Sequence, residues 1–248
     1  MRTVGFGRSG GTGRRAGFKI PSWQQGEGST PSFGNVRTEY RKQNTEIMLT
    51  NVTIADLWRP REKTPAGLYD ISLILCGSLL IGLSAQIAIG WPVPFTMQTF
   101  AVLMIGALFG ARRGGLTVFV YLIEGAAGLP VFSLGRGGPA VLFGPTGGYL
   151  FGFIAAAYVT GLLAQKGWDR KITTTIIAMI IGDLLLLSSG LLWLSLIIGV
   201  RNALATGVYP FIIGDMIKIG LAAALLPTGW KLLARFGPAN GNKKSEEY

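Results

Sequence analysis

The sequence contains no histidine and a single cysteine, Cys76, among its 248 residues. Without histidine the chain cannot form a Ser-His-Asp triad, an HExxH zinc site or a Ser/His dyad inside a membrane. A lone cysteine forms neither a disulfide within one chain nor a cysteine-rich metal site. These absences disfavour hydrolytic and metal-dependent enzymes, so we expect no catalytic residues, no metal and no cofactor.

Charged residues are also scarce, at 14% of the chain, whereas hydrophobic residues make up 49%. The mean hydropathy of +0.44 is too high for an ordinary soluble domain and indicates a protein that crosses a membrane several times. The formal net charge of +11 would suit nucleic acid. The basic residues are, however, scattered through loops and tails with no basic helix, so we expect no nucleic-acid partner.

Residues 1–47 differ in composition from the rest of the chain. They are rich in Gly, Ser, Thr and Arg, with no acidic residue before Glu27, and cannot build a core. We interpret them as a disordered basic extension. Two alternatives stay open: translation starts at Met48, or the extension targets the protein to an organelle envelope membrane. Residues 48–69 would form a cytoplasmic lead-in and residues 236–248 a cytoplasmic tail.

Six apolar segments separated by short loops fall within residues 70–235, the expected transmembrane domain. A helix needs about 20 residues to cross the roughly 30 Å hydrocarbon layer at about 1.5 Å per residue. The segments are 71–89, 95–110, 114–129, 147–165, 172–199 and 209–226. The prolines of GWPVP separate the first two, and Pro227 is expected to end the sixth. The sequence therefore predicts an all-α membrane protein with six transmembrane helices.

Lysine and arginine are divided unevenly between the loops. One side carries Arg136 and Arg201 alone. The other side carries twelve, namely Arg59, Arg61, Lys63, Arg112, Arg113, Lys166, Arg170, Lys171, Lys231, Arg235, Lys243 and Lys244. The positive-inside rule then places both termini in the cytoplasm of a multi-pass protein of the cell membrane. The loop 131–146 would face outward.

Two oppositely charged residues, Asp215 and Lys218, lie within the sixth apolar segment. An ionised side chain near the bilayer centre costs at least about 2.5 to 3.5 kcal/mol, so such residues are usually kept for a function. A spacing of three puts both on one helix face. They form either a structural ion pair or a site that offers an acceptor and a cation to a polar ligand, and we favour the site. At helical rise they lie about 8 and 12 Å below Pro210, so the site would open outward.

The loop after the third segment is the second candidate region. Its sequence, GLPVFSLGRGGPAVLFGPTGGYLFGF at 128–153, is rich in glycine, which allows close backbone approach to a ligand. No GKS or GKT follows GPTGGY, so a phosphate-binding P-loop is excluded. Arg136, the sole cation of this loop, is either solvated or a lid residue that meets a carboxylate through two hydrogen bonds. Glu124 and Asp183 are weaker candidates that could line a polar interior, pair with cations or cap a broken helix.

Three stretches in fixed order resemble the BioY family, the biotin-specific S components of energy-coupling factor (ECF) transporters. They are AQIAIGWPVPFTMQTFAVLMIGALFGARRG at 85–114, GLPVF followed by GPTGGYLFGF, and PFIIGDMIK. The resemblance covers about residues 73–226 and implies a six-helix S-component bundle that captures biotin at the outer face. The GDxxK element of the family falls on Gly214, Asp215 and Lys218, and its GPTGGY element on residues 144–149. The extension and Glu124 depart from the family pattern.

The resemblance also implies roles for individual residues. Asp215 and Lys218 would bind polar groups of biotin, with the ureido ring as the favoured target, and Arg136 would close over the valerate carboxylate. Tyr149 would pack against the ring or its chain, and Gly148 of the same element is counted among the substrate-binding residues.

The partners implied by the resemblance are biotin, the lipid bilayer, and a transmembrane coupling subunit with ATPase subunits, because the chain has no Walker motif. A homo-oligomer is the alternative if the protein works alone. An S component for another vitamin and, less favoured, an intramembrane enzyme are the alternative functions.

Overall fold

The computed structural model describes residues 52–60, 62–89 and 93–236 of the chain. The predicted basic extension at 1–47, the candidate start Met48 and nearly all of the predicted tail lie outside the described residues. The predictions made for those segments therefore stay predictions.

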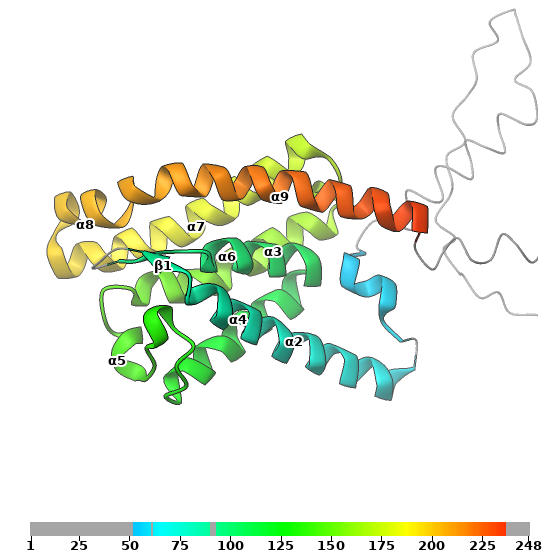
Figure 1. Cartoon of the computed structure of the whole chain (residues 1–248), viewed down its shortest axis with the longest axis horizontal. Helices are drawn as coiled ribbons and strands as arrows, with labels where there is room; N and C mark the ends of the chain where they lie inside the picture. Colours follow the sequence, from blue (N-terminus) through cyan, green and yellow to red (C-terminus); the bar gives the residue numbers. More distant parts are fainter. Residues whose placement is uncertain (1–51, 61, 90–92, 237–248) are drawn as a thin grey trace, which may run out of the picture. The chain divides into compact units, whose positions relative to one another are not determined.

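Helices dominate the described residues (Figure 1). The α-helices are α2 (Lys63–Ala85), α3 (Gln98–Phe109), α4 (Ala111–Ala126), α5 (Pro139–Leu142), α6 (Gly147–Gln165), α7 (Ile172–Ile198), α8 (Val200–Gly207) and α9 (Tyr209–Phe236). Three short 3₁₀ helices, η1 (Ile54–Trp58), η2 (Ser133–Gly135) and η3 (Trp168–Arg170), and two strands, β1 (Ala88–Ile89) and β2 (Phe95–Thr96), complete the set. The prediction of a mostly helical chain is confirmed.

Four helical stretches of the described residues are long and apolar enough to cross a membrane. They are Lys63–Ala85, Gly147–Gln165, Ile172–Ile198 and Val200–Arg235, which comprises α8 and most of α9. The α3 helix is apolar but has only 12 residues, and α4 has 16. Every predicted segment contains a helix, but helix length identifies four spans and does not confirm six. The chain is nevertheless a multi-pass membrane protein.

The first two predicted segments have different boundaries in the structure. The α2 helix begins at Lys63 rather than Ile71 and ends at Ala85 rather than Ile89. Residues 88 and 89 instead pair antiparallel with β2, so that Ala88 lies opposite Thr96 and Ile89 opposite Phe95. Pro94, next to this hairpin, has a fixed φ and no backbone N–H, which favours extended backbone over helix. The prediction of continuous helix through 86–89 and 95–97 is therefore wrong.

The prediction that Pro227 ends the sixth helix is also wrong. The α9 helix includes Pro227 and continues to Phe236. The proline lacks the N–H that would bond the carbonyl of Ala223, yet proline is tolerated within membrane helices because their packing partners hold the backbone in place. Ala223 and Leu226 are both buried on the side of α9 that packs against the bundle. Tertiary contacts thus keep the helix continuous.

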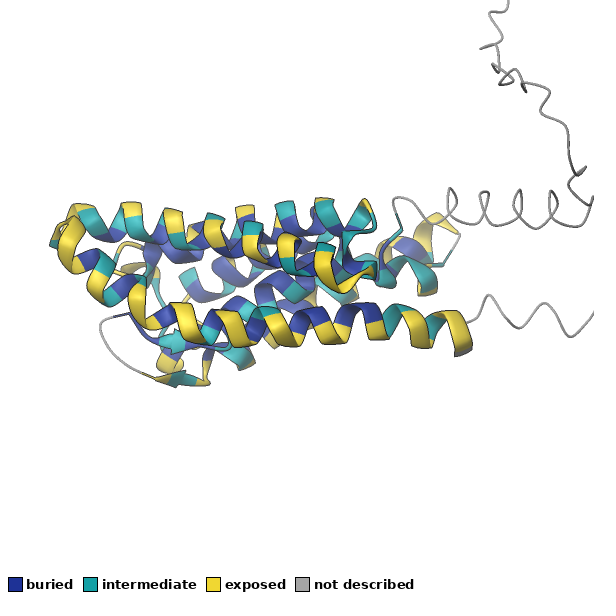
Figure 2. Ribbon diagram, turned by 90° about the horizontal axis from the view of Figure 1, so that it is seen from above, coloured by how far each residue is buried: buried dark blue, intermediate teal, exposed yellow. Residues whose placement is uncertain are grey.

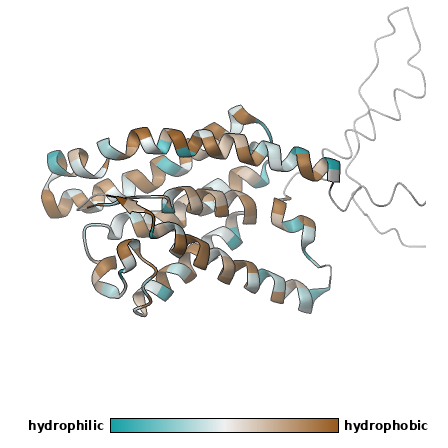
Figure 3. Ribbon diagram, in the orientation of Figure 1, coloured by the Kyte–Doolittle hydropathy of each residue, from teal (hydrophilic) through white to brown (hydrophobic). Residues whose placement is uncertain are grey.

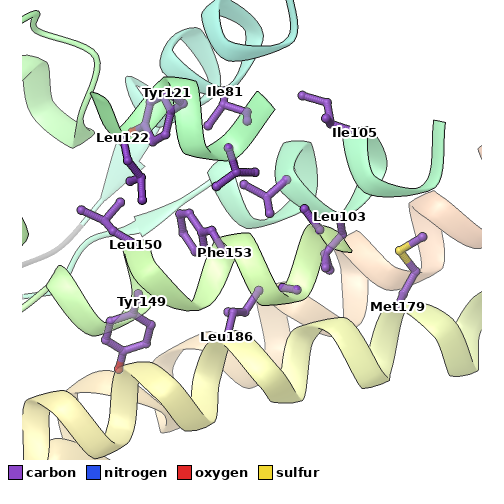
Figure 4. Close-up of a cluster of buried hydrophobic side chains, with 14 of the residues drawn as sticks. Ile81, Leu103, Ile105, Tyr121, Leu122, Tyr149, Leu150, Phe153, Met179 and Leu186 are labelled. Carbon is purple, nitrogen blue, oxygen red and sulfur yellow. The ribbon is translucent and has the colours of Figure 1, made fainter. Parts of the chain in front are cut away.

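Helix α6 is the central element of the bundle and packs against α3, α4 and α7. Glycine makes the close approach to α3 possible, because a Cβ at Gly106 would overlap the backbone of Ala157. Figure 4 shows side chains of α6 and of the helices around it meeting in one core, among them Ile81, Leu103, Tyr121, Phe153 and Leu186. This core fixes the helices that form the candidate site.

The outer helix faces are apolar as well as the inner ones. Figure 2 shows exposed positions repeating along the outside of the helices, and Figure 3 shows that hydrophobic residues occur on exposed and buried faces alike. Leu83 and Leu196, for example, are 68% and 87% exposed. Helices that are apolar all round are typical of membrane spans. The exposed leucines are therefore the lipid-facing surface of the protein, and Cys76 is exposed on the same helix as Leu83.

Candidate substrate-binding site

Asp215 and Lys218 form a buried ion pair within α9. The ammonium group of Lys218 lies 3.0 Å from Oδ1 of Asp215. Lys218 is only 6% exposed and Asp215 only 3%. The predicted placement of both charges on one helix face is thus confirmed. The second carboxylate oxygen of Asp215 is buried without a hydrogen-bond partner in the described residues. A buried acceptor without a donor is free to bind a polar group of a ligand.

Thr99 at the start of α3 and Phe95 of the hairpin also contact Lys218. Its ammonium donates a hydrogen bond to the Thr99 hydroxyl at 2.8 Å and lies 4.0 Å from the centre of the Phe95 ring, a cation–π contact. Asp183 of α7, 7% exposed, lines the same small cavity as Asp215, Lys218 and Thr99. The weaker candidate Asp183 therefore joins the site, which places two carboxylates around one ammonium.

A larger cavity lies under the loop that follows α4 and has a volume of about 40 Å³, against about 10 Å³ for the cavity around Lys218. Its walls are mostly apolar and aromatic, with a few polar side chains. They include Thr96, Gln98, Thr99, Phe132, Ser133, Tyr149, Phe153, Leu186 and Phe211. Thr99 lines both this cavity and the small one around Lys218, so the two are neighbours.

Tyr149 lines the larger cavity, and its contact with a ligand ring stays a prediction. Its ring stacks on Phe211 of α9 at a centroid distance of 6.2 Å and an interplanar angle of 18°. Its hydroxyl donates to the carbonyl of Gly207 at 2.7 Å, where a Cβ would overlap that hydroxyl. The ring is therefore held in one orientation and connects α6 to the junction between α8 and α9.

Arg136 lies in the loop over the cavity but is hydrogen-bonded within that loop. Its guanidinium donates to the carbonyl of Ser133 at 3.0 Å and to the Ser133 hydroxyl at 2.9 Å. Backbone pairing between Phe132 and Arg136 closes the same turn, in which Leu134 has a φ of +62°. Because Phe132 and Ser133 line the cavity, Arg136 shapes its roof. A direct contact between Arg136 and a ligand stays a prediction.

Gly148 lies where α6 touches α7. A Cβ at this position would overlap the Cβ of Trp193 and come within 2.7 Å of the carbonyl oxygen of Ser189. The absence of a side chain therefore allows the two helices to approach closely. The predicted role of Gly148 as a substrate-binding residue stays a prediction beside this packing role.

Gln98 is a polar cavity residue that the analysis of the sequence missed. Its side-chain amide donates to the Tyr121 hydroxyl at 2.8 Å, and that hydroxyl donates to the carbonyl of Val131 at 3.1 Å. The chain of bonds connects α3 through α4 to the loop over the cavity. The cluster of polar residues in FTMQTF, within an otherwise apolar segment, was the signal that could have identified Gln98 and Thr99.

Glu124 lies apart from these cavities and bonds to a neighbouring helix. The hydroxyl of Ser78 in α2 is 2.9 Å from Oε1 of Glu124 in α4. Oε2 of Glu124 is buried without a hydrogen-bond partner in the described part of the chain. Of the roles considered for Glu124, lining the polar interior between helices fits this position.

Comparison with known proteins decides the family. A sequence model of the BioY family matches residues 56–235. The chain belongs to the BioY family. This match leaves the predicted basic extension outside the family region, and it runs from within η1 almost to the end of α9.

The matches to individual BioY relatives extend over most of the length of each relative. The chain is 39% identical over 153 residues to a biotin transporter BioY of Thermotoga maritima. The aligned residues cover 61% of this chain and 89% of that protein. The chain is 40% identical over 154 residues to a biotin transporter BioY of Rhizobium etli, covering 58% of this chain and 82% of the relative.

A solved structure also resembles the fold. The S component for biotin from an ECF-type ABC transporter matches with a TM-score of 0.60 and 26% identity, over 68% of this chain and 95% of that one. The BioY chain therefore has the fold of an S component, and its relatives are named as transporters rather than enzymes.

Proposed function

We propose that this BioY protein takes up biotin across the membrane as the substrate-binding integral membrane component of a transporter. The cavity beside the buried pair of Asp215 and Lys218 is the observation that carries the proposal. It combines an apolar enclosure with an ion pair whose carboxylate has an unused acceptor oxygen. The names of the relatives and of the similar solved structure supply biotin as the ligand.

The polar and apolar parts of biotin suit different parts of this site. Biotin has a ureido ring with both N–H donors and a carbonyl acceptor, a thioether ring and a valerate chain that ends in a carboxylate. The ureido group would bond to Asp215 and Lys218 once Thr99 gives way, because a carboxylate accepts from N–H and an ammonium donates to C=O. Tyr149 and Phe211 would pack against the rings. Arg136 would turn from Ser133 to the carboxylate.

The orientation that we propose places the cavity toward the outside. Nine basic residues of the described chain lie at the ends of helices on the η1 side: Arg59, Lys63, Arg112, Arg113, Lys166, Arg170, Lys171, Lys231 and Arg235. Arg136 lies between η2 and α5 and Arg201 lies within α8, and helices α5 and α8 are at the other end of the bundle (Figure 1). The positive-inside rule then puts both termini in the cytoplasm of a cell-membrane protein. In this arrangement α2, α3, α4, α6, α7 and α9 cross the membrane, and the short α3 and α4 do so beside longer helices.

The energy for uptake must come from elsewhere, because the sequence has no Walker motif. We propose a transmembrane coupling subunit with ATPase subunits as partners, with a homo-oligomer as the arrangement if the protein works alone. Neither a metal nor a cofactor has a role in this proposal, and biotin is the transported substrate.

Equilibrium binding of radiolabelled biotin to the purified protein tests the proposal. Saturable binding that unlabelled biotin displaces, and that riboflavin and thiamine leave unchanged, would support it. Displacement by another vitamin at lower concentration than biotin would replace the proposed substrate. The absence of saturable binding by folded protein would remove the proposed function.

A further inference from the structure

A second hollow opens at the end of the described bundle that is opposite the larger cavity under the loop after α4. It has a volume of about 510 Å³. Helix α4 forms its floor, with α2 on one side and α6 on the other, since both pack against α4. The residues that line it are Arg59, Asp70, Ile74, Phe109, Ala111, Arg112, Arg113, Leu116, Tyr158, Leu162 and Gln165. We call this hollow the α2–α6 groove.

Positive charge is in excess at the polar end of the α2–α6 groove. Three arginines line it against one carboxylate, Asp70. Arg59 pairs with Asp70 at 2.7 Å, and Arg113 pairs with Asp56 beside the groove and lies 3.6 Å from Asp70. Three arginines and two aspartates together leave one net positive charge.

Arg112 carries the charge that these pairs leave over. It is exposed, and within the described residues no ion pair or hydrogen bond involves its guanidinium. The guanidinium of Arg113, by contrast, is already paired with Asp56 and lies near Asp70 through its buried Nη1 atom. The groove thus offers one free guanidinium, that of Arg112, beside arginines that are paired with aspartates. This arrangement suits a phosphate group.

The rest of the α2–α6 groove is apolar and faces outward. Leu116 of α4 is 50% exposed, and Tyr158 and Leu162 of α6 are 43% and 38% exposed. Leu162 lies one helical turn from Tyr158, so both are on the same face of α6. An apolar wall that leads away from an arginine cluster matches an amphiphile, with a charged group at one end and a hydrocarbon chain along the wall.

The polar end of the groove is held by close helix contacts. A Cβ at Gly161 would come within 2.7 Å of Cα of Ala111, so α6 lies directly against the start of α4. Gly110 makes the turn between α3 and α4 with a φ of +82°, and a Cβ there would lie 3.0 Å from the side-chain nitrogen of Gln165. These contacts hold the start of α4, with Arg112 and Arg113, beside the end of α6, with Gln165. The groove is therefore shaped before any ligand binds.

We propose that the α2–α6 groove binds an anionic phospholipid, with the phosphate at Arg112 and an acyl chain along Leu116, Tyr158 and Leu162. Basic pockets between membrane helices bind anionic headgroups, because arginine charge attracts them at the bilayer surface. A lipid fits better than a protein helix here, since the apolar wall faces the hydrocarbon layer while the arginines lie where a headgroup lies.

Native mass spectrometry of the purified protein tests this proposal with two lipids that carry the same acyl chains. Phosphatidylglycerol should stay bound to a larger fraction of the protein than zwitterionic phosphatidylcholine. Arg112→Gln should weaken phosphatidylglycerol binding about fivefold, which corresponds to about 1 kcal/mol for one arginine near the surface. Arg201→Gln, an exposed arginine of α8 at the opposite end of the bundle, is the matched control and should change nothing.

A second variant and a soluble competitor separate the remaining sources of binding. Leu162→Gln should weaken binding of the long-chain lipid, and sn-glycerol 3-phosphate should fail to displace it, because the headgroup alone lacks the apolar contact. Thermal unfolding of each variant confirms that it is folded. Equal binding of the two lipids, an unchanged affinity in Arg112→Gln, or displacement by glycerol phosphate would overturn the proposal. The proposal would also be overturned if no lipid were found bound to the protein and Arg112→Gln abolished co-purification of a protein partner.

Discussion

The ammonium group of Lys218 in α9 lies 2.8 Å from the hydroxyl of Thr99 in α3, although 119 positions separate the two residues. Thr99 lines the larger cavity under the loop as well as the small cavity around the ion pair. A ligand that displaces the Thr99 hydroxyl would therefore gain direct access to Lys218. The bond across the bundle brings the buried charges next to the larger cavity, with Thr99 between them.

We expect Asp215→Asn and Lys218→Met each to weaken biotin binding by more than tenfold, about 1.4 kcal/mol. Each change removes one polar partner from a buried site and leaves the other unpaired. Binding of radiolabelled biotin measures the loss, and thermal unfolding shows whether the variant is folded.

The double variant Asp215→Asn with Lys218→Met separates a ligand site from a structural pair. If the pair is only structural, removing both charges restores stability and binding together, because no buried charge is left alone. If the pair binds biotin, stability recovers while binding stays weak. A folded double variant with wild-type affinity would sink the site hypothesis.

Gly148→Ala should destabilise the protein by about 1 to 3 kcal/mol, because the added methyl group overlaps Trp193 in a tightly packed interface. Gly220→Ala is the matched control on α9, where a Cβ would meet nothing within 4 Å. It should stabilise the helix by up to about 1 kcal/mol. Unfolding in detergent measures both changes. A Gly148→Ala protein of unchanged stability and reduced biotin binding would favour ligand contact over packing.

Stability should depend on pH through Asp169 of η3. Burial raises the pKa of Asp169 to about 6, although the indole N–H of Trp230 donates to one carboxylate oxygen. Between about pH 4 and pH 6 the folded protein then binds more protons than the unfolded chain. The free energy of unfolding therefore falls as the pH rises through this range, by roughly 3 kcal/mol from this residue.

Asp169→Asn should remove this dependence while keeping an acceptor for Trp230. The measurement is the unfolding midpoint of both proteins from pH 4 to pH 7.5. Burial alone would raise the pKa of Asp56, but hydrogen bonds from Thr53 and Arg113 hold it below its usual value. Asp56 therefore makes the free energy of unfolding rise with pH, opposite to the effect of Asp169. The difference between wild type and variant isolates Asp169, and an identical pH profile in both would contradict the assignment.

A cysteine in place of Ala140 should report the orientation of the loop over the cavity. Ala140 is exposed in α5, and Cys76→Ser supplies a background without other thiols. With both termini in the cytoplasm, an impermeant thiol reagent added to intact cells should label the new cysteine. Labelling only after the membrane is opened would reverse the topology.

A chain that begins at Met48 should insert into the membrane and bind biotin like the full chain. The composition of residues 1–47 offers no buried surface, and the family match begins at residue 56. Membrane fractionation and biotin binding measure the outcome. Loss of insertion or mislocalisation on truncation would instead identify a targeting segment.

The sequence alone determined the membrane character, the mainly helical fold and the family. Long apolar runs leave helices as the favoured solution, because every backbone polar group must be bonded inside lipid. It also placed Asp215 and Lys218 on one helix face, since a spacing of three is a local property of a helix.

Only the tertiary structure decided where helices end and which residues meet. The hairpin of β1 and β2 shortened two predicted helices, and packing carried α9 past Pro227, because partners distant in the sequence replaced local preferences. The same holds for the site: Thr99 meets Lys218, and Gln98 meets Tyr121, through bonds between different helices. No local pattern specifies such pairs, since they depend on how close the helices approach, and glycines such as Gly106 and Gly148 set that approach only once α6 is surrounded by its neighbours.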